Sequence, residues 1–290
     1  MNETIAVGLH QPDGPVGLQD GRVALVEMED GHRCLTVLEQ DGRRREICRP
    51  GGRPTGLVTD GDGCFWVAGG PENSLVRLSP EGRMLQMIEG SDRGPFVLPH
   101  DLAFGPDGLL YMSDSGVRIA DLVIGQTIRP DFLNAAYNGR IYQIDPADGR
   151  VLRSLATGLL LASGIAFDSK GMLYYSEMLT GNIYRQVVGG RQEVFAQALR
   201  SPIGGSLRGP VGLAFDRDDT LYCAIYGQGD ISLIDASGKV SGHIRTNGAL
   251  PSNVAFTPDG KHVLITEQQH GAVERIPAPK PGLALHRPTI

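Results

Sequence analysis

The sequence predicts an all-β fold, a six-bladed β-propeller with four-stranded blades, and three observations support this prediction. One pattern recurs six times: a segment such as Gly-Leu-Ala-Phe, an Asp-Gly turn, and a second strand that often contains Leu-Tyr. The copies begin at residues 13, 55, 100, 163, 211 and 252, and their intervals of 41 to 63 residues are typical of propeller blades. The 290 residues include 40 Gly and 19 Pro, which suits one large β-domain over residues 1–290.

The third copy shows how one blade forms. Residues 100–104 are expected as the innermost strand, and residues 109–114 return beside it after a Gly-Pro-Asp-Gly turn. Residues 139–145 and 151–156 follow as the third and fourth strands. The matching third strands of other blades are residues 75–78, 182–185 and 230–235. Aromatic residues recur inside the second strands, where we expect them to pack between blades: Trp66, Tyr111, Tyr174 and Tyr222.

The last blade has too little sequence for a fourth strand, because only three strands fit before residue 277. We expect residues 4–8 to supply the missing strand. The N-terminus then closes the ring and leaves no gap between the first and last blades.

The long interval in the third blade indicates an insertion at about residues 115–138. It follows the second strand, so it must emerge at the end of the central tunnel where that strand stops. Ordered long loops are usually functional, and we expect a lid or substrate wall. Arg118 and Arg129 in this lid are candidate contacts for an anionic substrate.

Composition excludes several functions. The formal net charge of −6 is unlike that of proteins that bind nucleic acid or anionic membranes, and no apolar run is long enough to span a bilayer. The four cysteines are scattered singly, without metal or redox spacing. We therefore expect a cytoplasmic protein that acts on a small molecule and has neither a nucleic-acid nor a membrane partner.

Two rings of side chains are predicted at the mouth of the tunnel, where chemistry is expected. The first ring comes from the entry of each innermost strand and contains Asp13, Thr55, His100, Ser163, Val211 and Ser252. The second ring comes from the end of each second strand and contains Glu27, Gly69, Asp114, Glu177, Ile225 and Glu267. Four carboxylates that face one opening repel each other unless a cation or a proton is shared.

The repeated segments resemble the blade signatures of the senescence-marker-protein/gluconolactonase family, which also includes luciferin-regenerating proteins. The segments that carry the resemblance are Asp-Gly-Pro-Val at 13–16, Pro-His-Asp-Leu at 99–102, Ser-Gly-Ile-Ala-Phe at 163–167, Pro-Val-Gly-Leu-Ala-Phe at 210–215 and Pro-Ser-Asn-Val-Ala-Phe at 251–256. The resemblance implies a propeller hydrolase that opens a lactone with a divalent cation at the tunnel mouth. The positions that match the family's metal ligands are Asp13, His100, Ser163 and Val211. Val211 cannot ligate a metal, so this set suits Zn²⁺, Mn²⁺ or Fe²⁺ better than Ca²⁺.

Three interpretations of the site stay open. In the first, a metal on Asp13 and His100, with help from Asp114, Glu177 or Glu267, activates water against a lactone. In the second, there is no metal, and His100 is a general base for hydrolysis, isomerisation, elimination or cyclisation. In the third, the propeller binds a small molecule without catalysis. The candidate catalytic residues are His100, Asp101 and Ser163. The candidate substrate contacts are Thr55, Arg118, Arg129, Ser252 and Asn253.

Overall fold

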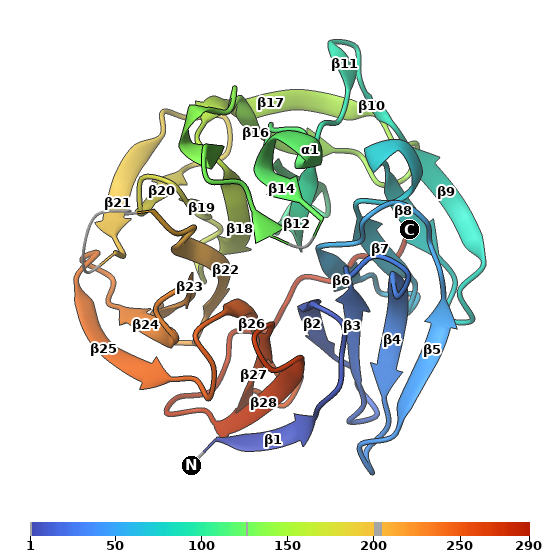
Figure 1. The fold of residues 1–290 in the computed structure, drawn as a ribbon, viewed down its shortest axis with the longest axis vertical. Coiled ribbons are helices and arrows are strands. Elements are labelled where there is room, and N and C mark those ends of the chain that lie inside the picture. Colours follow the sequence, from blue (N-terminus) through green and yellow to red (C-terminus); the bar gives the residue numbers. More distant parts are fainter. Residues whose placement is uncertain (1, 126, 200–204) are drawn as a thin grey trace.

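The computed structural model describes residues 2–125, 127–199 and 205–290. Six four-stranded antiparallel sheets stand around a central axis as the blades of a β-propeller (Figure 1). The predicted fold class is confirmed. Each innermost strand lies beside the axis, and its blade extends outwards from it.

The strands occupy equivalent positions in the six blades. The innermost strands are β2 (Pro12–Gly17), β6 (Leu57–Thr59), β12 (Pro99–Phe104), β18 (Ala162–Phe167), β22 (Gly209–Phe215) and β26 (Pro251–Phe256). The second strands are β3 (Val23–Glu27), β7 (Phe65–Ala68), β13 (Leu110–Asp114), β19 (Leu173–Glu177), β23 (Leu221–Tyr226) and β27 (His262–Glu267). The third strands are β4 (Cys34–Leu38), β8 (Leu75–Leu78), β16 (Gly139–Ile144), β20 (Asn182–Gln186), β24 (Asp230–Ile234) and β28 (Ala272–Pro277). The outer strands are β5 (Arg44–Cys48), β9 (Met84–Ile88), β17 (Val151–Leu159), β21 (Glu193–Gln197), β25 (Val240–Arg245) and β1 (Glu3–Ala6).

The N-terminal strand closes the ring. β1 pairs antiparallel with β28, with Glu3 opposite Arg275 and Ala6 opposite Val273. The Arg275 guanidinium also contacts the Glu3 carboxylate at 2.8 Å. The predicted closure is therefore confirmed, with the strand at Glu3–Ala6 instead of residues 4–8.

Aromatic pairs join neighbouring blades. In four places a ring from a second strand packs edge-on against a Phe at the end of the next blade's innermost strand. The pairs are Trp66 with Phe104, Tyr111 with Phe167, Tyr174 with Phe215 and Tyr222 with Phe256. The predicted packing of these second-strand aromatics between blades is confirmed, and such pairs favour the edge-to-face arrangement seen here.

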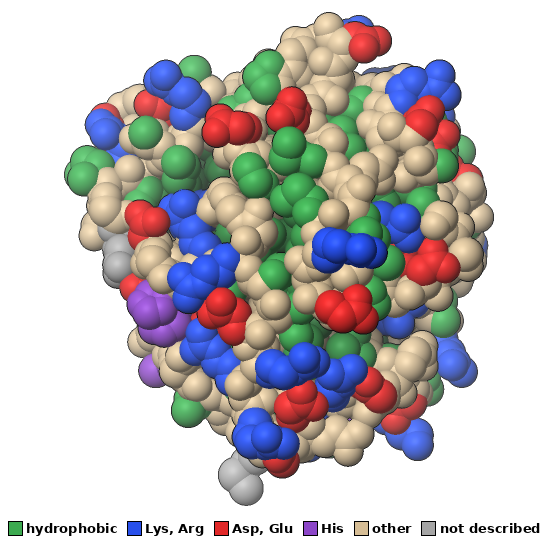
Figure 2. All heavy atoms as spheres, turned by 90° about the vertical axis from the view of Figure 1, so that its right-hand side faces the viewer, with side chains coloured by type: hydrophobic (Ala, Val, Ile, Leu, Met, Phe, Trp, Pro, Cys, Tyr) green, Lys and Arg blue, Asp and Glu red, His purple; other side chains and the backbone are tan. Residues whose placement is uncertain are grey.

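One side of the outer rim combines charged and apolar side chains. Figure 2 shows the side that carries β5 and β9, where hydrophobic side chains gather among acidic and basic ones. On β9 the exposed apolar residues are Met84, Leu85 and Met87, whereas β5 exposes Arg44, Arg45 and Glu46.

The C-terminal segment crosses one end of the ring and closes the tunnel there. Leu283 N donates to Phe215 O at 2.9 Å, and Gly61 N donates to Pro288 O at 2.7 Å, so the segment reaches from the fifth blade to the second. This end is opposite the predicted mouth, because it lies where the innermost strands finish.

The remaining elements are short: η1 (Pro71–Asn73), β10 (Gly90–Ser91), β11 (Gly94–Pro95), α1 (Ile119–Leu122), β14 (Val123–Ile124), β15 (Thr127–Ile128) and η2 (Phe132–Asn134). Among the described residues, no helix has the length and apolar character to span a membrane.

Candidate functional site

Irregular strand pairing turns the first ring toward the axis. In five blades the register between the innermost and second strands shifts near the inward-facing residues. A β-bulge of this kind re-aims side chains and lets consecutive residues face one side. In the third blade the shift lies between Pro99 and Leu102, and both His100 and Asp101 face the tunnel, His100 at its mouth and Asp101 deeper.

Most first-ring residues line one cavity of about 110 Å³ at the tunnel mouth, here called the mouth cavity. Its polar wall consists of Asp13, Arg53, Thr55, His100, Tyr226, Ser252 and Gln268. Its apolar wall consists of Met28, Leu98, Ile128, Met178, Leu207 and Val211. The structure thus brings five of the six predicted first-ring residues together around one space.

Ser163, the sixth member, lies against His100. Its hydroxyl oxygen is 3.2 Å from Nε2 and 3.4 Å from Nδ1 of the His100 ring. Ser163 is buried and, unlike His100, is not among the residues that line the mouth cavity. It is therefore placed to orient the ring.

Burial shifts the protonation of the two titratable first-ring residues in opposite directions. Burial, opposed by a hydrogen bond from Gly14 N, raises the pKa of Asp13 to about 7. Burial, with the nearby positive charge of Arg53, lowers the pKa of His100 to about 4. At neutral pH the imidazole is uncharged, while the Asp13 carboxyl group is protonated in about half of the molecules.

Arg53 is a mouth residue that sequence reasoning missed. It lies in the loop before β6, outside the repeated segment, and its guanidinium donates from Nη1 to Met28 O at 3.2 Å and from Nη2 to Gln11 Oε1 at 3.3 Å. The sequence feature that could have indicated Arg53 is the Gly-Gly pair at 51–52, which forms a turn in which both residues have positive φ. That turn directs the following arginine inwards.

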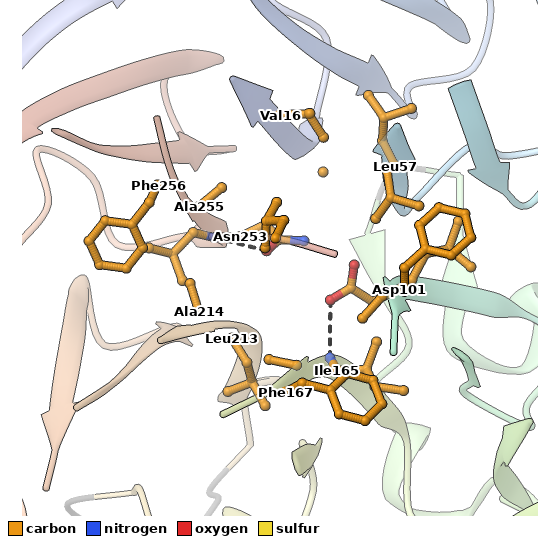
Figure 3. A pocket seen from close by; sticks show the side chains of 18 of the residues that line it. Val16, Leu57, Asp101, Ile165, Phe167, Leu213, Ala214, Asn253, Ala255 and Phe256 are labelled. Carbon is orange, nitrogen blue, oxygen red and sulfur yellow. Dashed lines mark hydrogen bonds between the residues drawn. The ribbon is translucent and has the colours of Figure 1, made fainter. Parts of the chain in front are cut away.

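Asp101 and Asn253 lie deeper in the tunnel, in the wall of a second cavity of about 100 Å³ that the C-terminal segment covers. Figure 3 shows Asp101 pointing into this space, where its Oδ2 accepts a hydrogen bond from Ile165 N at 3.2 Å. Burial and the repulsion of Asp13 raise the pKa of Asp101 to about 7. The Asn253 side chain interacts with both carboxyl groups and links the two cavities.

The acids of the second ring do not converge on the mouth, which corrects the prediction. Each one accepts a backbone N–H from the segment that enters the innermost strand of its own blade. The donors are His10 N to Glu27 (2.8 Å), Leu98 N to Asp114 (2.9 Å), Leu160 N to Glu177 (2.7 Å) and Leu250 N to Glu267 (3.1 Å). These carboxylates brace loops, since a buried anion is stabilised by convergent N–H donors.

The insertion in the third blade lies over the mouth (Figure 1). Ile128 of β15 forms part of the cavity wall, and Leu122 and Phe132 pack into the same core cluster as Val211. Arg118 and Arg129 do not reach the cavity. They form ion pairs with Asp121 and Asp131 at the outer surface, at 2.7 and 2.9 Å.

Comparison with known proteins identifies the family. The model of the SMP-30/gluconolactonase/LRE-like region matches residues 92–269. This chain belongs to the SMP-30/gluconolactonase/LRE-like family. Diisopropyl-fluorophosphatase of Loligo vulgaris is 24% identical over 280 residues, covering 90% of this chain and 87% of that protein. The gluconolactonase of Zymomonas mobilis is 23% identical over 295 residues, covering 91% and 78%.

Solved structures of the SMP-30/gluconolactonase/LRE-like family share the fold. A luciferin-regenerating enzyme superposes with a TM-score of 0.79 at 14% identity, covering 100% of this chain and 99% of that one. Regucalcin of Agrobacterium tumefaciens, described as a calcium-binding protein, gives 0.73 at 18% identity, covering 99% and 96%.

The mouth cavity does not fit the divalent cation that the SMP-30/gluconolactonase/LRE-like family implies. No group of three or more His, Cys, Asp or Glu side chains in the described ranges is arranged to hold a metal. Val211 presents a buried apolar side chain at its matched position, and the Ser163 hydroxyl lies against the His100 ring. The predicted ligand pair of Asp13 and His100 is thus left with Arg53, a cation, as its charged neighbour.

Proposed function

We propose that this chain is a lactonase-like hydrolase that opens a lactone or related cyclic ester by water attack in the mouth cavity. The observation that carries the proposal is the arrangement of neutral His100 and weakly acidic Asp13 in the wall of one small cavity. Relatives named gluconolactonase and diisopropyl-fluorophosphatase support a hydrolase that acts on a small molecule. A 6-deoxy-6-sulfogluconolactonase of Pseudomonas putida, 37% identical over 87 residues that cover 27% of this chain and 28% of that protein, agrees with this.

His100 acts as the base in this proposal. An uncharged imidazole nitrogen accepts the proton of a water molecule while the water oxygen bonds to the lactone carbonyl carbon. Ser163 contacts the ring at 3.2 Å and fixes its orientation. Because Ser163 does not line the mouth cavity, water is favoured over the serine hydroxyl as the nucleophile.

Asp13 acts as the acid. When the tetrahedral intermediate collapses, the ring C–O bond breaks and the leaving oxygen takes the proton of the Asp13 carboxyl group. His100 then returns its proton to Asp13 through solvent, and the product is a hydroxy acid. A carboxyl group with a pKa of about 7 holds this proton in a large fraction of molecules at neutral pH.

Thr55 and Ser252 shape the mouth cavity in this proposal, and Asn253 lies in the wall of the deeper cavity. Thr55 Oγ1 donates to Pro99 O at 2.9 Å, and Ser252 Oγ donates to Pro12 O at 2.7 Å, so both hydroxyls brace neighbouring blades. Their remaining lone pairs can accept hydrogen bonds from substrate hydroxyl groups. Asp101 supports the site from below, through Asn253. The four unpaired cysteines support a cytoplasmic location.

The test is product analysis with glucono-δ-lactone and with simple γ- and δ-lactones, followed by NMR. We expect the hydroxy acid as the product, above the uncatalysed rate. If His100 instead catalyses elimination or isomerisation, the product would be unsaturated or rearranged, and no water would be added to the substrate. A propeller that only binds would give a saturable shift of lactone signals without turnover.

A further inference from the structure

Arg53 is fixed in the wall of the mouth cavity by the chain on both sides. Gly52 has a φ of +58°, and a Cβ there would overlap Gly70 O, so the turn before Arg53 requires glycine. After Arg53, Thr55 N donates to Ala68 O at 2.9 Å. The backbone that carries the arginine is therefore held in place before any ligand binds.

The Arg53 guanidinium has more N–H donors than it uses in hydrogen bonds to the described chain. Its hydrogen bonds within the described chain go to Met28 O and Gln11 Oε1, and both acceptors are uncharged. Arginine carries five N–H donors in a planar fork. Three N–H groups are thus left without a hydrogen-bonded protein acceptor in the described chain, and the planar fork of a guanidinium suits a carbonyl, oxyanion or carboxylate oxygen.

The positive charge of Arg53 acts on the other groups of the cavity. Burial raises the pKa of Asp13 and of Tyr226, and the charge of Arg53 opposes that rise, whereas burial lowers the pKa of His100 and Arg53 adds to that fall. All three residues line the same cavity. Asp13 and Arg53 interact in this way, yet they do not form an ion pair within 4.0 Å. Both side chains line the mouth cavity, so the two charges share one space.

A metal ion in the same space would meet a fixed positive charge and a poor donor set. Asp13 is the carboxylate of the cavity wall, and Val211 offers only methyl groups. A guanidinium is weakly hydrated compared with an ammonium group and stays charged when it is buried. It can supply the positive charge that a divalent ion supplies elsewhere.

We propose that Arg53 is the electrophilic catalytic residue of this site and makes the reaction independent of a divalent cation. The inference rests on the proposed lactone hydrolysis. As water attacks, the carbonyl π electrons move to the carbonyl oxygen, and the Arg53 N–H groups stabilise the resulting oxyanion. When the intermediate collapses, the electrons return and the ring C–O bond breaks. Arg53 donates hydrogen bonds throughout and transfers no proton.

The experiment compares wild type, Arg53→Met, Arg53→Lys and the surface control Arg150→Met after exhaustive dialysis against EDTA, with glucono-δ-lactone as the probe. We expect full wild-type activity after chelation and a loss of kcat of about 10²- to 10³-fold in Arg53→Met, the range for losing an oxyanion donor. Arg53→Lys should retain part of the activity, and Arg150→Met all of it. Circular dichroism and Tm establish that each variant is folded.

Two further readouts do not depend on turnover. Isothermal titration of the wild type with Ca²⁺ and Mn²⁺ should show no binding, whereas Arg53→Met/Val211→Asp should bind one of them. Titration with gluconate, the product carboxylate, should show binding to wild type that Arg53→Met loses. Chelator-sensitive turnover, tight Ca²⁺ binding by wild type, or normal turnover in folded Arg53→Met would overturn the role of Arg53. Absence of turnover of any lactone would instead overturn the proposed function.

Discussion

Ser163 and His100 are 63 residues apart in the chain, yet the serine hydroxyl lies 3.2 Å from Nε2 of the imidazole. They occupy the same ring position in neighbouring blades, β12 and β18. The propeller repeat therefore assembles a hydrogen-bonded pair that no local motif encodes. Removing this contact tests whether the serine orients the base or attacks the substrate.

Ser163→Ala should lower kcat only by about 10-fold, because water remains the nucleophile and His100 loses only its orienting contact. Steady-state kinetics and a search for an acyl-enzyme by mass spectrometry provide the measurement. Loss of all activity, with an acyl group trapped on Ser163 in the wild type, would show that the serine is the nucleophile.

The activity should follow a bell-shaped pH profile. His100 must be neutral, so the rate falls as pH drops through about 4; Asp13 must be protonated, so it falls as pH rises through about 7. The measurement is kcat/KM from pH 3 to 9, corrected for spontaneous lactone hydrolysis. Asp13→Asn should remove most activity, and a rate that keeps rising above pH 8 would contradict Asp13 as the acid.

The lid should contribute to substrate binding through Ile128. Ile128→Ser places a polar group in the cavity wall and should raise KM by about 10-fold or more, since it removes apolar contact with the substrate. Leu133→Ser changes a lid residue that is 51% exposed and serves as the matched control. Equal kinetics for the two variants would remove the lid from the binding site.

Asp114→Asn should destabilise the fold without changing the chemistry. Its carboxylate accepts hydrogen bonds from Val97 N, Leu98 N and Gly116 N at 2.8 to 2.9 Å. Replacing one carboxylate oxygen with an NH₂ group should lower the free energy of unfolding by about 2 kcal/mol, as measured by urea denaturation. A loss of kcat in the folded variant, or a change in metal binding, would show that Asp114 takes part in the functional site.

Asp101 should make the protein less stable as pH rises. Its pKa in the folded state, about 7, lies above the ordinary 3.8, so folding favours the protonated form. Its stabilising contribution is complete below pH 3.8 and is lost as pH rises through 7. When the pH is raised from 5 to 8, the Tm of Asp101→Asn should therefore fall less than the Tm of the wild type. The exposed control Asp41→Asn should behave as wild type, and parallel Tm curves for Asp101→Asn would refute the shift.

The sequence was sufficient for the fold and for most of the first ring, because each blade repeats its own local signals. A Gly-Leu-Ala-Phe segment and an Asp-Gly turn define a hairpin, and equivalent positions of equivalent hairpins must meet at one axis. The closing strand followed from counting strands in the last blade.

The second ring was mispredicted because strand register places a residue at the end of a strand but does not show which group its side chain binds. Glu267 occupies the predicted place, but its carboxylate turns to the N–H groups of the preceding loop. Arg118 was predicted to contact substrate, but it pairs with Asp121 three residues later, a spacing at which side chains of one helical turn meet.

Arg53 was missed because no repeat contains it. Its place depends on a turn with positive φ and on hydrogen bonds to Gln11 and Met28, which are distant in the chain. Such contacts between blades arise from the three-dimensional assembly and leave little local pattern.

The central claim, lactone hydrolysis with His100 as the base, is tested most directly by kcat of His100→Ala at pH 6. His262→Ala, a change in the strand β27, serves as the matched control. We predict a loss of at least about 10²-fold for His100→Ala, within the range for a general base, and wild-type kinetics for the control. Folded His100→Ala that hydrolyses the lactone at the wild-type rate would contradict the account.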